Sequence, residues 1–235
     1  DEWRAGYQID LPALTTLGGG LYVTWGDLHG NSRLMRLSAD NLTSLLTLYI
    51  EDYSSINALS LAKLKTVTGD VYFSSVGLSD LSGLPSLEEI GGSLTLTNMP
   101  NLKNVDALSA LATVKNLTVE GNSNLRTLAG LSALATVTGD LRIYNNSRLG
   151  DVDGLSALTS VDGALLVQSN PSLPDVNGLS RLGSVGADLT ISGNASLRFC
   201  GGVYPVLGGA SGESQVAGTV TIANNDPGCS SVEDV

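Results

Sequence analysis

Charged and aromatic side chains are scarce in this 235-residue chain, at 15% and 5% of its residues. Globular domains typically carry about 25% charged residues, so the shortage is a real departure. The rarer sign is positive, with 12 Lys and Arg against 23 Asp and Glu and a formal net charge of −11. Binding to nucleic acid needs a basic footprint, so we expect no nucleic-acid partner. The shortage of charge does not indicate disorder, because 42% of the residues are apolar and can form a core.

Long apolar runs and reactive side chains are also missing. No run approaches the roughly 18 residues of a membrane-spanning helix, so we expect no membrane insertion of this segment. A single histidine, His29, gives little support for a Ser–His–Asp triad or a metal centre. The sequence therefore predicts no enzyme, no bound metal and no cofactor.

Cysteine is limited to Cys200 and Cys229, which lie 29 positions apart near the C-terminal end. Two interpretations are open: a pair of independent thiols, or a disulfide that closes the intervening loop. We favour the disulfide, which would stabilise the fold by about 3 kcal/mol in the chain-entropy model. A disulfide implies an oxidising compartment, so the expected location is secreted or cell-surface.

The residues that replace charges are Leu, Ser, Thr, Asn and Gly, and they form a repeat. A short alternating motif, typified by Leu141-Arg142-Ile143 after a Gly-Asp pair, recurs every 23 to 25 residues and then once more after an insertion. Its apolar-polar-apolar pattern predicts a strand with one buried face. Nine copies align, starting at Leu21, Leu46, Val71, Leu94, Leu117, Leu141, Leu165, Leu189 and Val220.

The best-preserved unit, residues 139–163, reads G-D-L-x-I-x-x-N-x-x-L-x-x-V-x-G-L-x-x-L-x-x-V-x-G. After the strand motif its apolar residues recur every three positions, which suits short extended or 3₁₀ segments and not an α-helix. One unit cannot bury its own apolar row, but stacked units share a continuous core. The sequence therefore predicts a mostly β, leucine-rich-repeat-like parallel β-solenoid of about nine coils.

We expect a single solenoid domain over residues 1–235. Residues 1–45 would form an irregular N-terminal cap and first coil, 46–198 the regular repeats, and 199–235 a disulfide-closed C-terminal cap. The turn after each strand carries a recurring asparagine that can adopt left-handed backbone and can bond to its neighbours as a ladder. We interpret this ladder as structural; its members are Asn122, Asn146, Asn170, Asn194 and Asn225.

Two segments resemble the receptor L domain, the leucine-rich module of the insulin and EGF receptors that also occurs in bacterial surface proteins. Residues 178–194 read GLSRLGSVGADLTISGN, and residues 199–229 resemble the end of the bacterial versions. The resemblance covers roughly residues 40–229 and implies a right-handed solenoid, an extracellular setting and non-catalytic ligand recognition. The receptors' cysteine-rich modules are missing, so no growth-factor contact is carried over to any residue.

The outward side chains of the strands are the candidates for a ligand site. Tyr22, Tyr49 and Tyr72, with Trp25 beside them, would cluster on the first three coils, and Tyr and Trp dominate interaction hot spots. The alternative interpretation is that Tyr simply has high strand propensity. Arg142 and Tyr144, on outward positions further along, complete the candidate set.

Three other chemistries are open but less favoured. Outward threonines suggest an ice-binding face, which Glu120 and Arg142 would interrupt. Asp151, Asp153 and Asp175 fall at matching corners and could attract Ca²⁺, although a solvated acidic edge is the default. Asp140 and Asp188 could form a glycoside-hydrolase pair, but both occupy the turn position of the repeat.

The sequence therefore favours an extracellular recognition or adhesion module that binds a protein or glycan through its exposed strand face. The alternatives are an ice-binding solenoid and a passive structural spacer in a surface protein.

Overall fold

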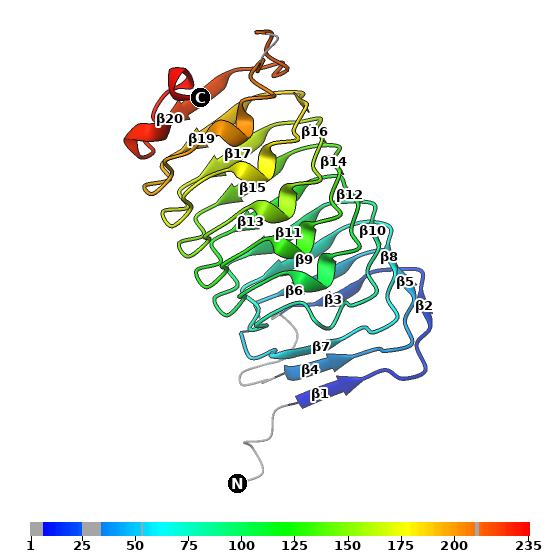
Figure 1. The fold of residues 1–235 in the computed structure, drawn as a ribbon. Helices are drawn as coiled ribbons and strands as arrows, with labels where there is room; N and C mark the ends of the chain where they lie inside the picture. Colours follow the sequence, from blue (N-terminus) through cyan, green and yellow to red (C-terminus); the bar gives the residue numbers. More distant parts are fainter. Residues whose placement is uncertain (1–6, 25–33, 53, 210–211) are drawn as a thin grey trace.

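Parallel strands, stacked one above another from coil to coil, build the molecule, and helix is almost absent (Figure 1). The structure is a computed structural model that describes residues 7–24, 34–52, 54–209 and 212–235. The predicted parallel β-solenoid is confirmed.

The largest sheet contains the strand motif of each repeat. Its strands alternate buried and outward side chains as predicted, so that Leu141 and Ile143 are fully buried while Arg142 is exposed. In the described part of the chain this sheet has nine strands: β3 (Leu21–Val23), β6 (Leu48–Glu51), β9 (Val71–Ser74), β11 (Leu94–Thr97), β13 (Leu117–Glu120), β15 (Leu141–Tyr144), β17 (Leu165–Gln168), β19 (Leu189–Ser192) and β20 (Val220–Ala223).

A second side of the coils consists of two-residue strands whose second residue is Leu, Ile or Val and points into the core. These strands are β2 (Thr16–Leu17), β5 (Ser44–Leu45), β8 (Thr66–Val67), β10 (Glu89–Ile90), β12 (Thr113–Val114), β14 (Thr136–Val137), β16 (Ser160–Val161) and β18 (Ser184–Val185).

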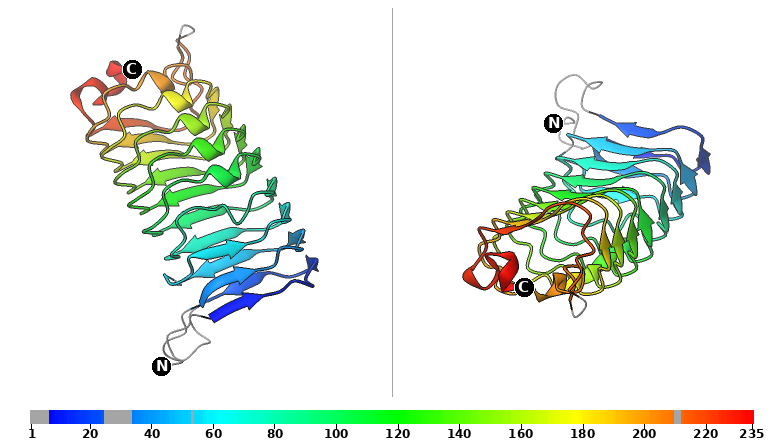
Figure 2. Two further views of the ribbon diagram at one scale, coloured as in Figure 1. Left: turned by 60° about the horizontal axis from the view of Figure 1, so that its bottom comes forward. Right: turned by 90° about the horizontal axis from the view of Figure 1, so that it is seen from above.

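The third side changes along the chain. The first coils use strands, namely β1 (Tyr7–Asp10), β4 (Leu34–Ser38) and β7 (Ala58–Ser60). Later coils use short 3₁₀ helices that stack on one another (Figure 2). These helices are η3 (Asp106–Leu108), η4 (Ala129–Leu131), η5 (Asp153–Leu155), η6 (Asn177–Leu179) and η7 (Gly201–Val203).

Four of the five stacked 3₁₀ helices, η4 to η7, have glycine at their centre, whereas η3, the first of the stack, has Ala107. A Cβ on Gly154 would lie 1.8 Å from the carbonyl oxygen of Leu128 in the preceding coil. The apolar residues around the helix follow the three-residue beat of the sequence, and Leu155, Leu158 and Val161 are fully buried. The core is therefore a set of apolar rows that run along the axis.

The asparagine column lies inside the solenoid and joins coil to coil. Asn122, Asn146, Asn170 and Asn194 are fully buried. The backbone N–H of Asn122 donates to Oδ1 of Asn146 at 3.1 Å, and Nδ2 of Asn146 donates to the carbonyl of Val119 at 2.9 Å. The same pair of bonds recurs at the other positions, and Asn225 ends the column by accepting from the N–H of Asn194 at 2.9 Å.

The left-handed residue of each turn is not the column asparagine. It is the residue before it, such as Asn145 with φ of 60° or Gly193 with φ of 68°. The expectation of left-handed backbone at the column asparagines was therefore wrong. The column asparagines serve as hydrogen-bonding side chains because their amide groups both donate and accept.

The C-terminal end is covered by a short cap. A disulfide joins Cys200 in the last coil to Cys229 in η8 (Pro227–Cys229), and both residues are buried. A final 3₁₀ helix, η9 (Val232–Asp234), begins with a capping box at Ser231.

The number of coils differs slightly from the prediction. The described residues make about seven turns instead of nine. The prediction counted strand copies, and the outermost strands do not lie on complete turns. For example, β20 leads directly into the cap.

Candidate recognition surface

The outward face of the nine-stranded sheet carries two parallel columns of side chains. The first column follows the second residue of each strand and the second column follows the fourth. The first column is Tyr22, Tyr49, Tyr72, Thr95, Thr118, Arg142, Leu166, Thr190 and Thr221. The second is Glu51, Ser74, Thr97, Glu120, Tyr144, Gln168, Ser192 and Ala223. Of these, Ser74, Thr97 and Ser192 are buried.

The register of the second coil corrects the sequence alignment. The predicted strand copy began at Leu46, but the strand β6 begins at Leu48. Both choices present an apolar-polar-apolar triplet, so alternation alone could not separate them. Burial does: Leu48 and Ile50 are fully buried, whereas Leu46 is 47% exposed. The correction moves Tyr49 into the same column as Tyr22 and Tyr72.

Tyr22, Tyr49 and Tyr72 consequently form one continuous aromatic group, which we call the tyrosine stack. The rings of Tyr49 and Tyr72 are parallel within 8° and their centroids lie 4.5 Å apart. The ring of Tyr22 continues the stack at 5.9 Å from Tyr49 with a tilt of 36°, and Tyr22 is 61% exposed. Stacked rings expose their edges and hydroxyls to solvent because their faces cover each other. Tyr22, at the end of the stack, also exposes one face of its ring.

Glu51 orients the middle ring. The hydroxyl of Tyr49 donates to Oε2 of Glu51 at 2.7 Å. This hydrogen bond, together with desolvation and the charge of Glu51, raises the pKa of Tyr49 to about 12. A carboxylate acceptor favours the neutral phenol, so Tyr49 keeps its proton at any physiological pH.

The remaining candidates do not join this group. Trp25 lies outside the described residues. Arg142 and Tyr144 lie on β15, three strands beyond Tyr72 in the sheet. Arg142 forms an ion pair with Asp140 at 2.7 Å. Burial first, and then a hydrogen bond with Glu120, raises the pKa of Tyr144 to about 12.

The threonines of the first outward column form two separate pairs. Thr95 pairs with Thr118, and Thr190 pairs with Thr221. Arg142 and Leu166 occupy the positions between these pairs in the same column. The structure therefore contains no uninterrupted threonine array among the described strands.

The acidic corner brings Asp151 and Asp175 near Asp153. Burial, followed by the charges of Asp151 and Asp175, raises the pKa of Asp153. Among the described residues, no group of three or more His, Cys, Asp or Glu side chains is positioned to hold a metal ion.

The side chains of Asp140 and Asp188 accept hydrogen bonds from backbone N–H groups of the next coil. Oδ1 of Asp140 accepts the N–H of Ala164 at 2.8 Å, and Oδ1 of Asp188 accepts the N–H of Thr219 at 2.7 Å. Each carboxylate therefore stabilises the turn of the following coil, and this hydrogen bond is a structural role for both residues.

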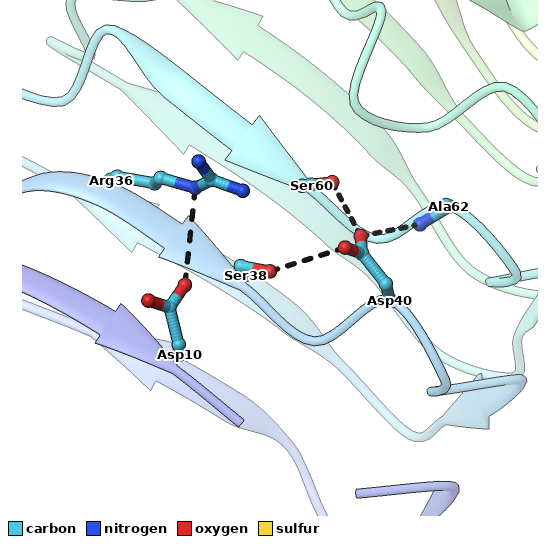
Figure 3. A network of polar contacts seen from close by, with 6 residues as sticks. All are labelled: Asp10, Arg36, Ser38, Asp40, Ser60 and Ala62. Atoms are coloured by element: carbon cyan, nitrogen blue, oxygen red, sulfur yellow. Dashed lines mark hydrogen bonds and ion pairs between the residues drawn. The ribbon is translucent and has the colours of Figure 1, made fainter. Parts of the chain in front are cut away.

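A polar network on the third side joins the first coils (Figure 3). The carboxylate of Asp40 accepts hydrogen bonds from the hydroxyls of Ser60 and Ser38 and from the N–H of Ala62. These contacts, led by Ser60, lower the pKa of Asp40. Beside them, Arg36 pairs with Asp10 at 3.9 Å. The network links β1, β4 and β7.

One feature was missed at the level of the sequence. A groove of about 290 Å³ lies along the corner that follows the large sheet, and Lys103, Arg126 and Arg148 line it. We call it the basic groove. The only signal in the sequence was the recurrence of a cation 23 residues after Lys103, which is one coil later. An isolated recurrence of this kind carries little information without the stacking register.

Scans of the chain against protein-family models, curated proteins and solved structures give no match. The resemblance to the receptor L domain therefore stays an expectation from the sequence. No helix in the described part of the chain has both the length and the apolar character needed to cross a membrane.

Proposed function

We propose that this chain is a non-catalytic recognition or adhesion module of a secreted or cell-surface protein. It binds a protein or glycan partner through the outward face of the nine-stranded sheet, at the tyrosine stack. The observation that carries the proposal is the contiguity of Tyr22, Tyr49 and Tyr72 on a solvent-facing surface.

The tyrosine stack has the character of a contact surface. Aromatic residues make up only 5% of the chain, yet three of them meet in one outward column. Strand propensity explains a tyrosine at any single outward position, but it does not require adjacent positions. Stacked rings lose little conformational freedom on binding and offer both apolar edges and hydroxyls, which is typical of hot spots.

The disulfide supports the proposed location. Cys200 and Cys229 are bonded, and such bonds persist in oxidising compartments. The spacer and ice-binding alternatives make different predictions. A spacer has no saturable ligand, and an ice-binding face produces thermal hysteresis.

The test begins with selection of binders for the intact chain from a glycan array and from a displayed protein library. A triple variant, Tyr22→Ala with Tyr49→Ala and Tyr72→Ala, is then compared with the wild type. We expect at least about a 100-fold loss of affinity, because each buried hot-spot tyrosine contributes about 2 kcal/mol or more.

The matched control changes the far end of the same column, as Leu166→Ala with Thr190→Ala and Thr221→Ala. Its affinity should stay within about three-fold of the wild type, because these positions lie outside the stack. Circular dichroism melts establish that both variants fold. Binding that survives the tyrosine changes would contradict the assigned face, and the absence of any saturable binder would favour the spacer.

A further inference from the structure

The basic groove stands out against the charge of the whole molecule. The chain has a net charge of −11, but the described lining of the groove contains Lys103, Arg126 and Arg148 and no acidic residue. None of these three cations forms an ion pair with any described residue. Lys63, Lys115 and Arg181 also form no ion pair among the described residues, but they lie outside the groove, where three such cations gather. The charge of Lys103 contributes to the lowered pKa of the nearby Asp80 carboxyl.

The stacking of the coils places two of the cations next to each other. The N–H of Lys103 donates to the carbonyl of Ser79 at 2.9 Å, and the N–H of Arg126 donates to the carbonyl of Lys103 at 3.1 Å. Lys103 and Arg126 therefore occupy the same position of consecutive coils, about 4.8 Å apart along the axis. Both side chains line the groove, so one anionic ligand can contact the two cations together.

Asparagine side chains complete the groove. Nη1 of Arg148 donates to Oδ1 of Asn124 at 2.7 Å, and Nδ2 of Asn124 donates to the carbonyl of Pro100 at 2.5 Å. Asn124 thus holds the guanidinium group of Arg148 in place, and Arg148 keeps further N–H donors for a ligand. Asn57 and Asn101 line the same groove. Nδ2 of Asn101 donates to the carbonyl of Gly77 at 3.2 Å and keeps a second N–H donor.

Two carboxylates, three coils apart, flank the cations of the groove. Asp80 follows Ser79 in the chain, and its carboxylate accepts the N–H of Ser82 at 2.9 Å and the hydroxyl of Ser79 at 3.1 Å. Asp151 follows Gly150, whose N–H donates to the carbonyl of Arg126. The residues that follow Lys103 and Arg126 are the neutral Asn104 and Thr127. A long polyanion such as nucleic acid, or an extended anionic membrane, would reach the two carboxylates, whereas a short anionic ligand over Lys103 and Arg126 would meet neutral side chains.

We propose that the basic groove binds an acidic oligosaccharide, with Lys103, Arg126 and Arg148 on its carboxylate or sulfate groups and the asparagines on its hydroxyls. Guanidinium groups match the planar geometry of such oxyanions, and amides exchange hydrogen bonds with sugar hydroxyls. This site is separate from the tyrosine stack and does not depend on it.

The experiment is calorimetric titration of the intact chain with three probes of equal length: tetragalacturonate, sulfated maltotetraose and unmodified maltotetraose. We expect saturable binding of at least one acidic probe and none of the neutral one. The acidic probe that binds more tightly identifies carboxylate or sulfate as the preferred group. The tyrosine triple variant should bind the same probe unchanged, which separates this site from the proposed recognition face.

Two pairs of substitutions locate the site. Lys103→Gln with Arg126→Gln should weaken binding at least about ten-fold, because both charge-assisted contacts are lost. The matched control, Lys115→Gln with Arg181→Gln, removes the same charge from exposed positions outside the groove and should change affinity less than about two-fold. Arg148→Lys keeps the charge but loses the planar fork, and should give an intermediate loss.

Three results would overturn the proposal. One is that neither acidic oligosaccharide binds. Another is that the control pair weakens binding as much as the groove pair, which would indicate attraction to overall charge. The third is that short single-stranded DNA or phosphatidylserine vesicles compete as strongly as the oligosaccharide.

Discussion

The coils before residue 100 and the coils after it form the same sheet with different internal parts. The column that holds Asn122 and Asn146 in the later coils is occupied by Val76 and Met99 in the earlier ones. The third side also changes, from strands to stacked 3₁₀ helices. The regular coils bury their polar groups in a repeated hydrogen-bond pattern, and the irregular coils fill the same space with apolar side chains.

The outward side chains of the nine-stranded sheet also differ before and after residue 100. The tyrosine stack and the network around Asp40 both lie on the earlier coils. Past it, the outward columns hold mainly Thr, Ser and single charged residues. On the sheet face, therefore, the proposed recognition surface lies on the earlier coils, while the later coils carry the basic groove at the corner that follows the sheet.

The largest expected effect comes from breaking the asparagine column. Asn146→Leu removes the acceptor for the N–H of Asn122 and the donor for the carbonyl of Val119. Two buried groups are left unsatisfied, so we expect a loss of about 4 kcal/mol in the free energy of unfolding. Met99→Leu, in the same column of the earlier coils, should cost less than about 1.5 kcal/mol. Urea denaturation compares the two, and equal losses would remove the distinction between the two regions.

Removal of the disulfide should destabilise mainly the C-terminal end of the solenoid. Cys200→Ala with Cys229→Ala releases a loop of 29 residues and should reduce stability by about 3 kcal/mol. Because each coil contacts mainly its neighbours, the effect should appear in β19 and β20 and not in β6. Hydrogen exchange of the strand amides measures this. Uniform destabilisation along the chain would show that the coils are coupled over a longer range.

The 3₁₀ stack gives a third test. Gly154→Ala places a Cβ against the carbonyl of Leu128 and should cost about 2 kcal/mol through forced separation of the coils. Gly201→Ala is the matched control, since a Cβ there meets no atom within 4 Å. Thermal unfolding of both variants provides the measurement, and a similar melting temperature for the two would argue against tight stacking.

The smallest effect concerns the two tyrosines with a raised pKa. A hydrogen bond to Glu51 is the largest cause at Tyr49, whereas burial is the largest cause at Tyr144. Glu51→Gln should therefore lower the pKa of Tyr49 towards 10.0 by more than Glu120→Gln lowers that of Tyr144. NMR titration of ring-labelled tyrosines resolves both groups. Equal shifts would mean that the carboxylate controls both rings alike.

The raised pKa of Tyr49 also makes the free energy of unfolding depend on pH above pH 10. In the folded chain the pKa of Tyr49 is about 12, above the ordinary value of 10.0 that applies when unfolded. The neutral phenol therefore contributes its full stabilisation below pH 10, and this contribution is lost as the pH rises towards about 12. In Tyr49→Phe, the loss of stability over this range should be smaller.

The sequence was sufficient for the repeat but not for its ends. Alternation in Leu141-Arg142-Ile143 and the following three-residue beat predicted both the strands and the 3₁₀ corners, because each pattern reflects which side chains are buried. The prediction for the second coil was wrong because strands that begin at Leu46 and at Leu48 both fit the alternation, and only packing distinguishes them. Contacts between coils, such as those of Arg148 with Asn124, depend on register and could not be predicted.

Hydrogen exchange of the chain, with and without a selected binder, tests the central claim most directly. The account predicts that protection on binding is confined to residues 21–24, 48–51 and 71–74, the strands of the tyrosine stack. Protection centred on residues 141–144 and 189–192, with the first three strands unchanged, would contradict it.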